Sequence, residues 1–368
     1  MLSAPTTATA ANIADVAKLS ATVFGKPMTV YFPTLFYEYY AENNFIITDD
    51  EKPVALVGTY TADIQIPGAT FTCSSVGSVC TDREYRGKGI ATDLVLYAEK
   101  SLAERGADVI FISGGRSLYT RQGYTHLPMY EAFEPDAADT DVALEPVEPG
   151  DIGRLIEFYN AVPVRFMRPY NDFALLHGAR SVYNRLGNGA HPTYVVVKNG
   201  VPSGYFMTYE REKMSEIIEY GGDPQAVIDG ICKYSHNIGR PGVVTMPRPD
   251  PAMRAAAQSR GYAIRATTEG STVKVVNFTQ LVQKLWPYFA QILPREDIFK
   301  LTMAYDGAAW RITYGDEVWS TTEIREVNTL VLGDALQILD LSETPNLERI
   351  LRKVFPLPVP SVDNCNYI

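Results

Sequence analysis

A glycine-containing turn between a long β-rich stretch and an amphipathic helix restricts the fold of this chain most strongly. The turn reads Arg-Gly-Lys-Gly-Ile-Ala over residues 86–91 and follows a β-rich stretch at 69–81. From residue 90 to 105 the apolar side chains recur at helical spacing, and a glycine at 106 is typical of a helix end. A near-continuous apolar run at 107–113 suits a buried strand. The segment therefore predicts the order strand, turn, helix, strand.

The chemistry of this turn favours a compact polyanion such as a pyrophosphate. A helix N-terminus exposes unpaired N–H groups and a partial positive charge, and glycines allow a ligand to approach the backbone closely. Arg86 and Lys88 add two full positive charges. A Walker loop is excluded because Gly89 follows Lys88 where Ser or Thr is needed, and Thr92 replaces the third glycine of a dinucleotide-binding fingerprint.

Composition and charge exclude several classes of function. The 33 basic and 43 acidic side chains give a net charge of −10, which disfavours nucleic-acid binding. The sequence has no apolar run of about 18 residues and no secretory leader, so a cytoplasmic soluble protein without a membrane partner is expected. The four cysteines show no CxxC spacing and the four histidines no HxxxH, so we expect neither a metal nor a disulfide scaffold.

The 368 residues suggest two or three domains, and an acidic stretch at 134–141 resembles a first linker. In the first unit we expect helices at 12–24 and 90–105 and strands at 44–48, 54–66, 69–81 and 107–113. From residue 142 a similar order of strands and helices repeats without the glycine turn. From residue 271 we expect a strand at 273–276, helices at 278–286, 334–339 and 347–354, and strands at 301–305, 310–314 and 318–321.

The turn, the strand before it and a later tyrosine together resemble the GNAT superfamily of N-acetyltransferases. Val79-Cys80-Thr81 precedes an R/QxxGxG/A turn at 86–91, and Leu118 to Tyr124 fits the Y-x-x-x-G-F/Y stretch that follows the next strand in that family. Arg83 stands where the family often has proline, and this departure weakens the match to the family motif only slightly. The resemblance implies acetyl-CoA as cosubstrate and an enzyme of the N-acetyltransferase class.

The resemblance also implies residue roles. The strand end would offer backbone groups to the pantetheine arm, and the turn would hold the pyrophosphate. Tyr119 would be the general acid that protonates the departing CoA thiolate, although a tyrosine on a short helix can also be a core aromatic. The cofactor-binding residues implied in this way are Val79, Cys80, Thr81, Arg86, Gly87, Lys88, Gly89, Ile90 and Ala91.

The order of the three units resembles Eis-type (enhanced intracellular survival) acetyltransferases. This resemblance implies a mixed α+β protein with a catalytic GNAT unit at 1–134, a degenerate GNAT-like unit at 142–268 and a sterol-carrier-like α+β unit at 271–368. It also implies a homo-oligomer, a hexamer by resemblance alone. In the Eis type the terminal carboxylate enters the active site, and here Ile368 would supply that general base. A solvated tail is the alternative, but three prolines at 356–360 and an apolar end favour docking.

Transfer to a small-molecule primary amine, such as a polyamine, a lysine-like amine or an aminoglycoside-like amine, needs no enzyme nucleophile. Cys80 has no histidine near it in sequence, and a strand cysteine is usually a small buried hydrophobe. The aromatic residues before the first strands are either core or the wall of an acceptor pocket, and Arg168 either reaches the acceptor or supports an interface. The pocket candidates are Phe32, Phe36, Tyr37, Tyr40 and Arg168. A non-catalytic protein that senses CoA and holds an apolar ligand in the third unit remains the alternative function.

Overall fold

The computed structural model describes residues 1–182, 192–248, 250–267, 270–333, 340–361 and 366. Within these residues it contains two seven-stranded mixed sheets and one three-stranded antiparallel sheet. The predicted mixed α+β fold is therefore confirmed. The helix expected at 334–339 lies outside the described residues.

The first sheet has the strand order β1-β2-β3-β4-β5-β14, with β8 paired to β3. Its strands are β1 (Thr6–Thr7), β2 (Asn44–Asp49), β3 (Lys52–Ile66), β4 (Ala69–Thr81), β5 (Val109–Ile112), β8 (Arg165–Phe166) and β14 (Thr272–Val275). The helices that flank it are α1 (Ile13–Phe24), α2 (Met28–Tyr31), α3 (Pro33–Phe36), α4 (Ile90–Glu104) and α5 (Ser117–Thr120). The 3-10 helices are η1 (Glu38–Asn43) and η2 (Arg83–Tyr85).

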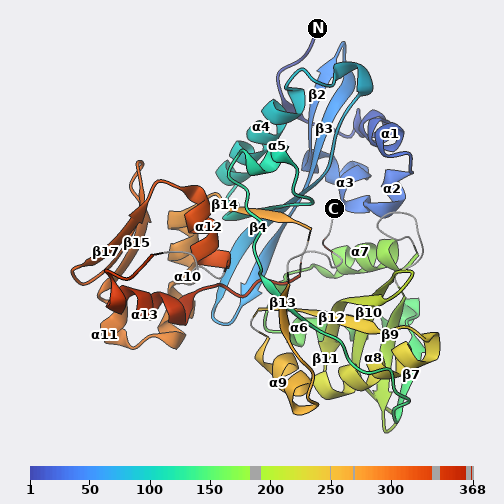
Figure 1. The fold of residues 1–368 in the computed structure, drawn as a ribbon. Helices are drawn as coiled ribbons and strands as arrows, with labels where there is room; N and C mark the ends of the chain where they lie inside the picture. The colour runs from blue at the N-terminus through green and yellow to red at the C-terminus, as the bar shows by residue number, and fades with distance from the viewer. Residues whose placement is uncertain (183–191, 249, 268–269, 334–339, 362–365, 367–368) are drawn as a thin grey trace.

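The side-chain alternation of β3 explains why helices cover both faces of this sheet (Figure 1). Leu56 packs in the hydrophobic cluster that contains α1 to α3. Its neighbour Val57 points to the opposite face and packs in the cluster that contains α4. The long strand is thus buried on both sides, as a central strand of a two-face sheet must be.

The second sheet has the order β13-β6-β12-β11-β10-β9-β7. Its strands are β6 (Tyr130–Phe133), β7 (Val142–Pro146), β9 (Thr193–Lys198), β10 (Val201–Glu210), β11 (Ser215–Gly222), β12 (Gly242–Pro247) and β13 (Arg265–Thr267). Its helices are η3 (Pro149–Asp151), α6 (Ile152–Ala161), α7 (Tyr170–Val182), α8 (Pro224–Ile238) and α9 (Pro251–Ser259). Parallel β11 and β12 are joined across α8, as β4 and β5 are joined across α4.

The third sheet is a meander with helices packed around it. Its strands are β15 (Leu301–Tyr305), β16 (Trp310–Tyr314) and β17 (Glu317–Thr321), and its helices are α10 (Phe278–Ile292), α11 (Arg295–Ile298), α12 (Ile324–Leu332) and α13 (Pro345–Val354). The sequence patterns predicted the three strands, α10 and α13 but not α12. No helix among the described residues is both long enough and apolar enough to cross a membrane.

Two strands cross the unit boundaries that we expected from the sequence. β6 lies inside the first unit by sequence but pairs with β12 in the second sheet. β14 lies inside the third unit by sequence but pairs with β5 in the first sheet. The three units are therefore joined by shared sheets, and the boundaries near residues 134 and 271 do not separate independent sheets.

The proline-rich tail is packed where the structure describes it. Leu357 and Val359 are fully buried in the cluster that also holds α10 and α13. The backbone N–H of Leu357 donates to the carbonyl of Val331 at 2.8 Å. Residues 355–361 are therefore packed against the rest of the protein, whereas the predicted entry of Ile368 into the active site concerns a residue outside the described ones.

Candidate active site

The end of β4 separates from its neighbour and opens a wedge in the first sheet. β4 pairs with β3 as far as Thr81, but its parallel pairing with β5 ends where Val76 faces Ile112. A bulge places Ser78 and Val79 opposite the single residue Val57, and Ser78 has a φ of 50°. The last residues of β4 therefore turn one backbone edge away from β5.

A cavity of about 420 Å³ lies at this wedge. It brings together the strand end, the turn, the start of α4 and the short helix α5, which are separated by up to 40 residues in the sequence. The lining residues are Val23, Phe24, Val79, Cys80, Thr81, Arg86, Ala91, Arg116, Leu118 and Tyr119. The predicted binding strand, the turn and the predicted general acid thus share one cavity.

The turn before α4 leaves open space at both glycines. Gly87 and Gly89 have φ values of 75° and 81°, and no protein atom lies within 4 Å of a Cβ built on either residue. Gly89 is the N-cap of α4 and brings no side chain to its N–H groups. Arg86 donates from Nε to the carbonyl of Thr81 at 3.1 Å, and Lys88 lies 5.0 Å from the ring centre of Tyr85. These features form a cradle that fits an anionic diphosphate.

The corresponding helix of the second unit is closed to such a ligand. Asp223 caps α8, and its carboxylate accepts the N–H of Ala226 at 2.7 Å. Pro224 occupies the first helical position, and a Cβ on Gly222 would meet the backbone of Gly204 at 2.4 Å. A carboxylate already occupies the place that an anion would take, so the second unit has no equivalent cradle.

Tyr119 combines the two interpretations that its sequence context allowed. Its side chain is only 4% exposed and belongs to the hydrophobic cluster between the sheet and α4. It also lines the 420 Å³ cavity, and its backbone N–H donates to the carbonyl of Arg116 at 2.9 Å to form the first turn of α5. A phenol held in this way sits at the cavity wall with little freedom to move.

Cys80 lies in the cavity wall but is poorly suited to form a covalent intermediate. Its side chain is buried, and this burial raises the pKa of the thiol to about 12 despite the opposing charge of Arg86. Only the thiolate is a strong nucleophile, so the thiol is unreactive at neutral pH. Direct transfer to the acceptor is the route that this arrangement favours.

The aromatic residues that we considered as an acceptor pocket divide into two groups. Phe32 and Phe36 are buried in the hydrophobic cluster that joins α1 to α3 with both the first and the second sheet, which matches the core interpretation. Tyr37 is about half exposed. Tyr40 donates to Oδ1 of Asp172 on α7 at 2.6 Å, and Tyr60 on β3 donates to Oδ2 at 2.9 Å. None of the four predicted aromatics lines the cavity beside Tyr119.

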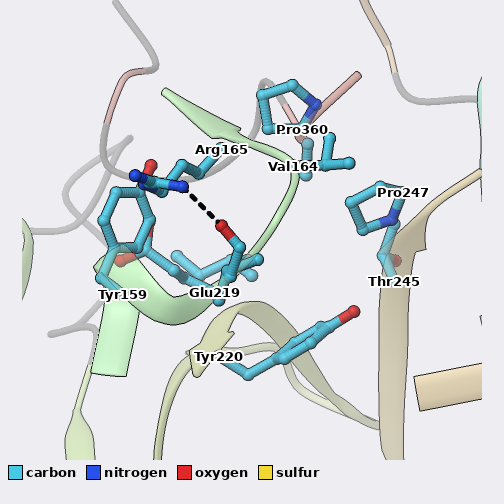
Figure 2. Close-up of a pocket in the computed structure, with 11 residues that line it drawn as sticks. Tyr159, Val164, Arg165, Glu219, Tyr220, Thr245, Pro247 and Pro360 are labelled. Atoms are coloured by element: carbon cyan, nitrogen blue, oxygen red, sulfur yellow. Dashed lines mark hydrogen bonds between the residues drawn. The ribbon is translucent and has the colours of Figure 1, made fainter. Parts of the chain in front are cut away.

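Arg168 lies in the second unit and is almost completely buried. It donates through Nη1 and Nη2 to Glu219 on β11 at 3.0 and 2.7 Å, and through Nε to Oδ1 of Asn366 at 2.5 Å. It therefore supports an interface, the second of the two interpretations that the sequence allowed. Glu219, Tyr159 and Pro360 are among the residues that line a small cavity of about 40 Å³ (Figure 2).

Sequence reasoning missed Glu219, Asp172 and Asn366. A carboxylate inside the apolar run Ile217-Ile218-Glu219 was the one available signal, because an unpaired charge is rarely buried. Ile368, the predicted general base, lies outside the described residues. Among the described residues no group of three or more His, Cys, Asp or Glu could hold a metal ion.

Comparison with known proteins gives a family match for the first unit. Residues 5–127 match the family model of an acetyltransferase (GNAT) domain. No curated protein sequence matches the chain. Among solved structures, a GCN5-related N-acetyltransferase from Anabaena variabilis covers 98% of both chains with a TM-score of 0.67 and 14% identity.

Two further solved structures share the full-length architecture. A probable N-acyltransferase from Enterococcus faecalis has a TM-score of 0.64 at 12% identity and covers 98% of both chains. Eis1 from Mycobacterium abscessus has a TM-score of 0.57 at 14% identity and covers 97% of this chain and 98% of its own. At these identities the likeness concerns the fold. The family match shows that residues 5–127, which contain the whole cradle, form an acetyltransferase (GNAT) domain, and this domain indicates an acyltransferase.

Proposed function

We propose that the protein is an acetyl-CoA-dependent N-acetyltransferase of the Eis type that acts on a primary amine. One observation carries the proposal: the open end of β4, the side-chain-free N-terminus of α4 and Tyr119 meet at a single cavity. A GNAT domain implies an acyl-CoA cosubstrate, and the two glycines leave the room that its diphosphate needs.

In the proposed reaction the amine attacks the thioester directly. A C–N bond to the acetyl carbon forms, the C–S bond breaks, and the thiolate takes the proton of the Tyr119 hydroxyl. A lysine-like amine has a pKa of about 10.4, so its deprotonation at pH 7 costs about 4.6 kcal/mol. A carboxylate beside the amine removes this proton, and we assign that role to the terminus of Ile368.

The acceptor that suits this chain is a polyamine, a lysine-like amine or an aminoglycoside-like amine. A net charge of −10 attracts a cation over the whole surface, and the exposed tyrosines near η1 offer rings to it. The Eis-type assignment also implies a homo-oligomer, which light scattering coupled to size exclusion measures directly.

The test is acceptor-dependent release of CoA thiol with a panel of polyamines, lysine peptides and aminoglycosides. We expect release with at least one acceptor, and a Tyr119→Phe variant that binds acetyl-CoA normally but has a kcat lower by about 10²–10⁴. Deletion of Tyr367 and Ile368 is expected to lower kcat strongly and to spare the affinity for acetyl-CoA. The absence of thiol release with every acceptor, together with no acetyl-CoA binding in calorimetry, would refute the proposal.

One observation favours a second candidate, a protein that senses CoA and holds an apolar ligand. A groove of about 670 Å³ lies between α4 and the third unit and is lined by Leu96, Phe278, Tyr305, Trp310 and Ile324, among others. On this alternative Tyr119→Phe leaves the function unchanged. A fall in kcat in that variant, with acetyl-CoA binding retained, decides in favour of the transferase.

A further inference from the structure

The second unit contains a buried ion pair that the proposed chemistry does not use. The side chains of Arg168 and Glu219 are 1% and 4% exposed and form a two-pronged contact. The hydroxyl of Tyr205 donates to Glu219 at 3.0 Å, and the rings of Tyr159 and Phe173 lie 4.2 and 5.5 Å from the guanidinium carbon. Burial costs several kcal/mol for each ion, so stability alone does not explain why the protein has this pair.

Of the guanidinium N–H groups that do not donate to Glu219, the one on Nε points to Asn366 near the end of the chain. Nε donates to Oδ1 of Asn366 at 2.5 Å across 198 positions of sequence. Asn366 is 1% exposed, so water does not compete for this contact. Because Glu219 and two rings hold the guanidinium, the Nε–H direction is fixed before the tail arrives.

A second contact holds the tail upstream of Asn366. The hydroxyl of Tyr130 donates to the carbonyl of Pro360 at 3.4 Å, and Pro360 and Ser361 line the small cavity that Glu219 also lines (Figure 2). Tyr130 on β6 of the second sheet and Arg168 of the second unit thus contact the tail at two points six residues apart. The N-terminus of α8 in the second unit is closed to an anion, because the carboxylate of Asp223 caps it.

We propose that the degenerate second unit is a dock for the C-terminal tail and that Arg168 is a positioning residue for the terminal carboxylate. Glu219 orients Arg168, and Arg168 orients Asn366. Asn366 stands two positions before Ile368, to which the proposed function assigns the general base, so loss of the contact at Asn366 is expected to impair catalysis. The catalytic part of this inference rests on the proposed function, whereas the dock itself does not.

Three variants separate the dock from a merely structural ion pair. Asn366→Ala removes the tail contact and leaves the pair with Glu219 intact. Arg168→Lys keeps a positive charge beside Glu219, but an ammonium group lacks the planar guanidinium that donates to Glu219 and Asn366 at the same time. Asn171→Ala, at an exposed asparagine of α7, is the matched control.

The first readout is removal of the terminal residues by a carboxypeptidase under native conditions, followed by intact mass. A hydrogen bond to a charged group changes a local equilibrium roughly ten- to hundredfold. We expect digestion at least tenfold faster in Asn366→Ala and Arg168→Lys than in the wild type and in Asn171→Ala. Digestion of Asn366→Ala at the wild-type rate would overturn the dock.

The second readout is steady-state acetyl transfer with the best acceptor of the panel. We expect kcat to fall about tenfold or more in Asn366→Ala while KM for acetyl-CoA stays unchanged. Faster digestion with an unchanged kcat would overturn the positioning role. If the wild type transfers no acetyl group, the proposed function fails, and the digestion rates still decide whether the dock exists.

Discussion

Replacement of Gly89 by aspartate tests the cradle, because it places a carboxylate at the N-terminus of α4, as Asp223 does at the N-terminus of α8 in the second unit. In the second unit the carboxylate of Asp223 occupies the helix N-terminus. Gly89 stands at the N-terminus of α4 with a φ of 81° and open space around it. Gly89→Asn is the matched control, because asparagine and aspartate are similar in size and both tolerate the left-handed conformation better than other residues.

The expected penalty follows from the charges. A carboxylate about 5 Å from a diphosphate of about two negative charges is repelled by about 1–2 kcal/mol at the dielectric of an exposed loop. This corresponds to about a tenfold difference in Kd between the aspartate and asparagine variants. Both variants bear the same backbone strain of about 1–2 kcal/mol, which cancels in the comparison.

Isothermal titration calorimetry with acetyl-CoA measures the difference directly. We expect the aspartate variant to bind about tenfold more weakly than the asparagine variant at low salt. At 1 M salt the Debye length falls to about 3 Å, so the gap is expected to narrow. Equal affinities of the two variants at low salt would refute the assignment of this turn to the diphosphate.

Three other predictions concern groups outside the cradle. Burial raises the pKa of the Cys80 thiol to about 12, so Cys80→Ala is expected to keep kcat within about twofold. For the same reason iodoacetamide at pH 7.5 is expected to label Cys80 only after unfolding, which peptide mass spectrometry measures. Labelling of the native protein would contradict this. Burial lowers the pKa of His177 from 6.5 to about 4. The unfolded state therefore binds more protons between these values, and stability falls as pH drops through this window, by at most about 3 kcal/mol. Tm measured from pH 7 to 4 should fall less in His177→Gln than in the wild type, and parallel curves would count against this reasoning. The Tyr40→Phe, Tyr60→Phe double variant loses two hydrogen bonds to Asp172 and is expected to lose about 1–3 kcal/mol of unfolding free energy in urea denaturation. An unchanged midpoint would show that these bonds contribute nothing.

The cradle could be predicted from the sequence because its parts are local. The strand end, the glycines and the first turn of α4 lie within about 15 residues, and each position has a physical requirement that the sequence displays. The link to Tyr119 needed only one helix and one strand between them, and the structure places both ends at the same cavity.

The tail dock could not be predicted because its parts are distant in the sequence. Arg168 and Glu219 are 51 residues apart, and Asn366 is 198 residues from Arg168. Each residue alone fits an exposed polar position, and only the fold shows that the three are buried together.

The shared sheets have the same explanation. Val273 and Val275 indicated a strand, but the pattern of a strand does not name its partner. β14 pairs with β5 because β5 is short and buried, and its outer edge needs hydrogen bonds. We placed a boundary at 271 because the pattern of strands and helices in the sequence changes there. The first sheet extends beyond this boundary because β14 pairs with the edge of β5.

A crystal structure of the protein with bound CoA tests the central claim most directly. We expect phosphate oxygens of the diphosphate at about 2.7–3.2 Å from backbone nitrogens of residues 87–91, and the sulfur in the cavity that Tyr119 lines. A diphosphate bound elsewhere, for example in the groove between α4 and the third unit, or a sulfur remote from the Tyr119 hydroxyl, would contradict the account.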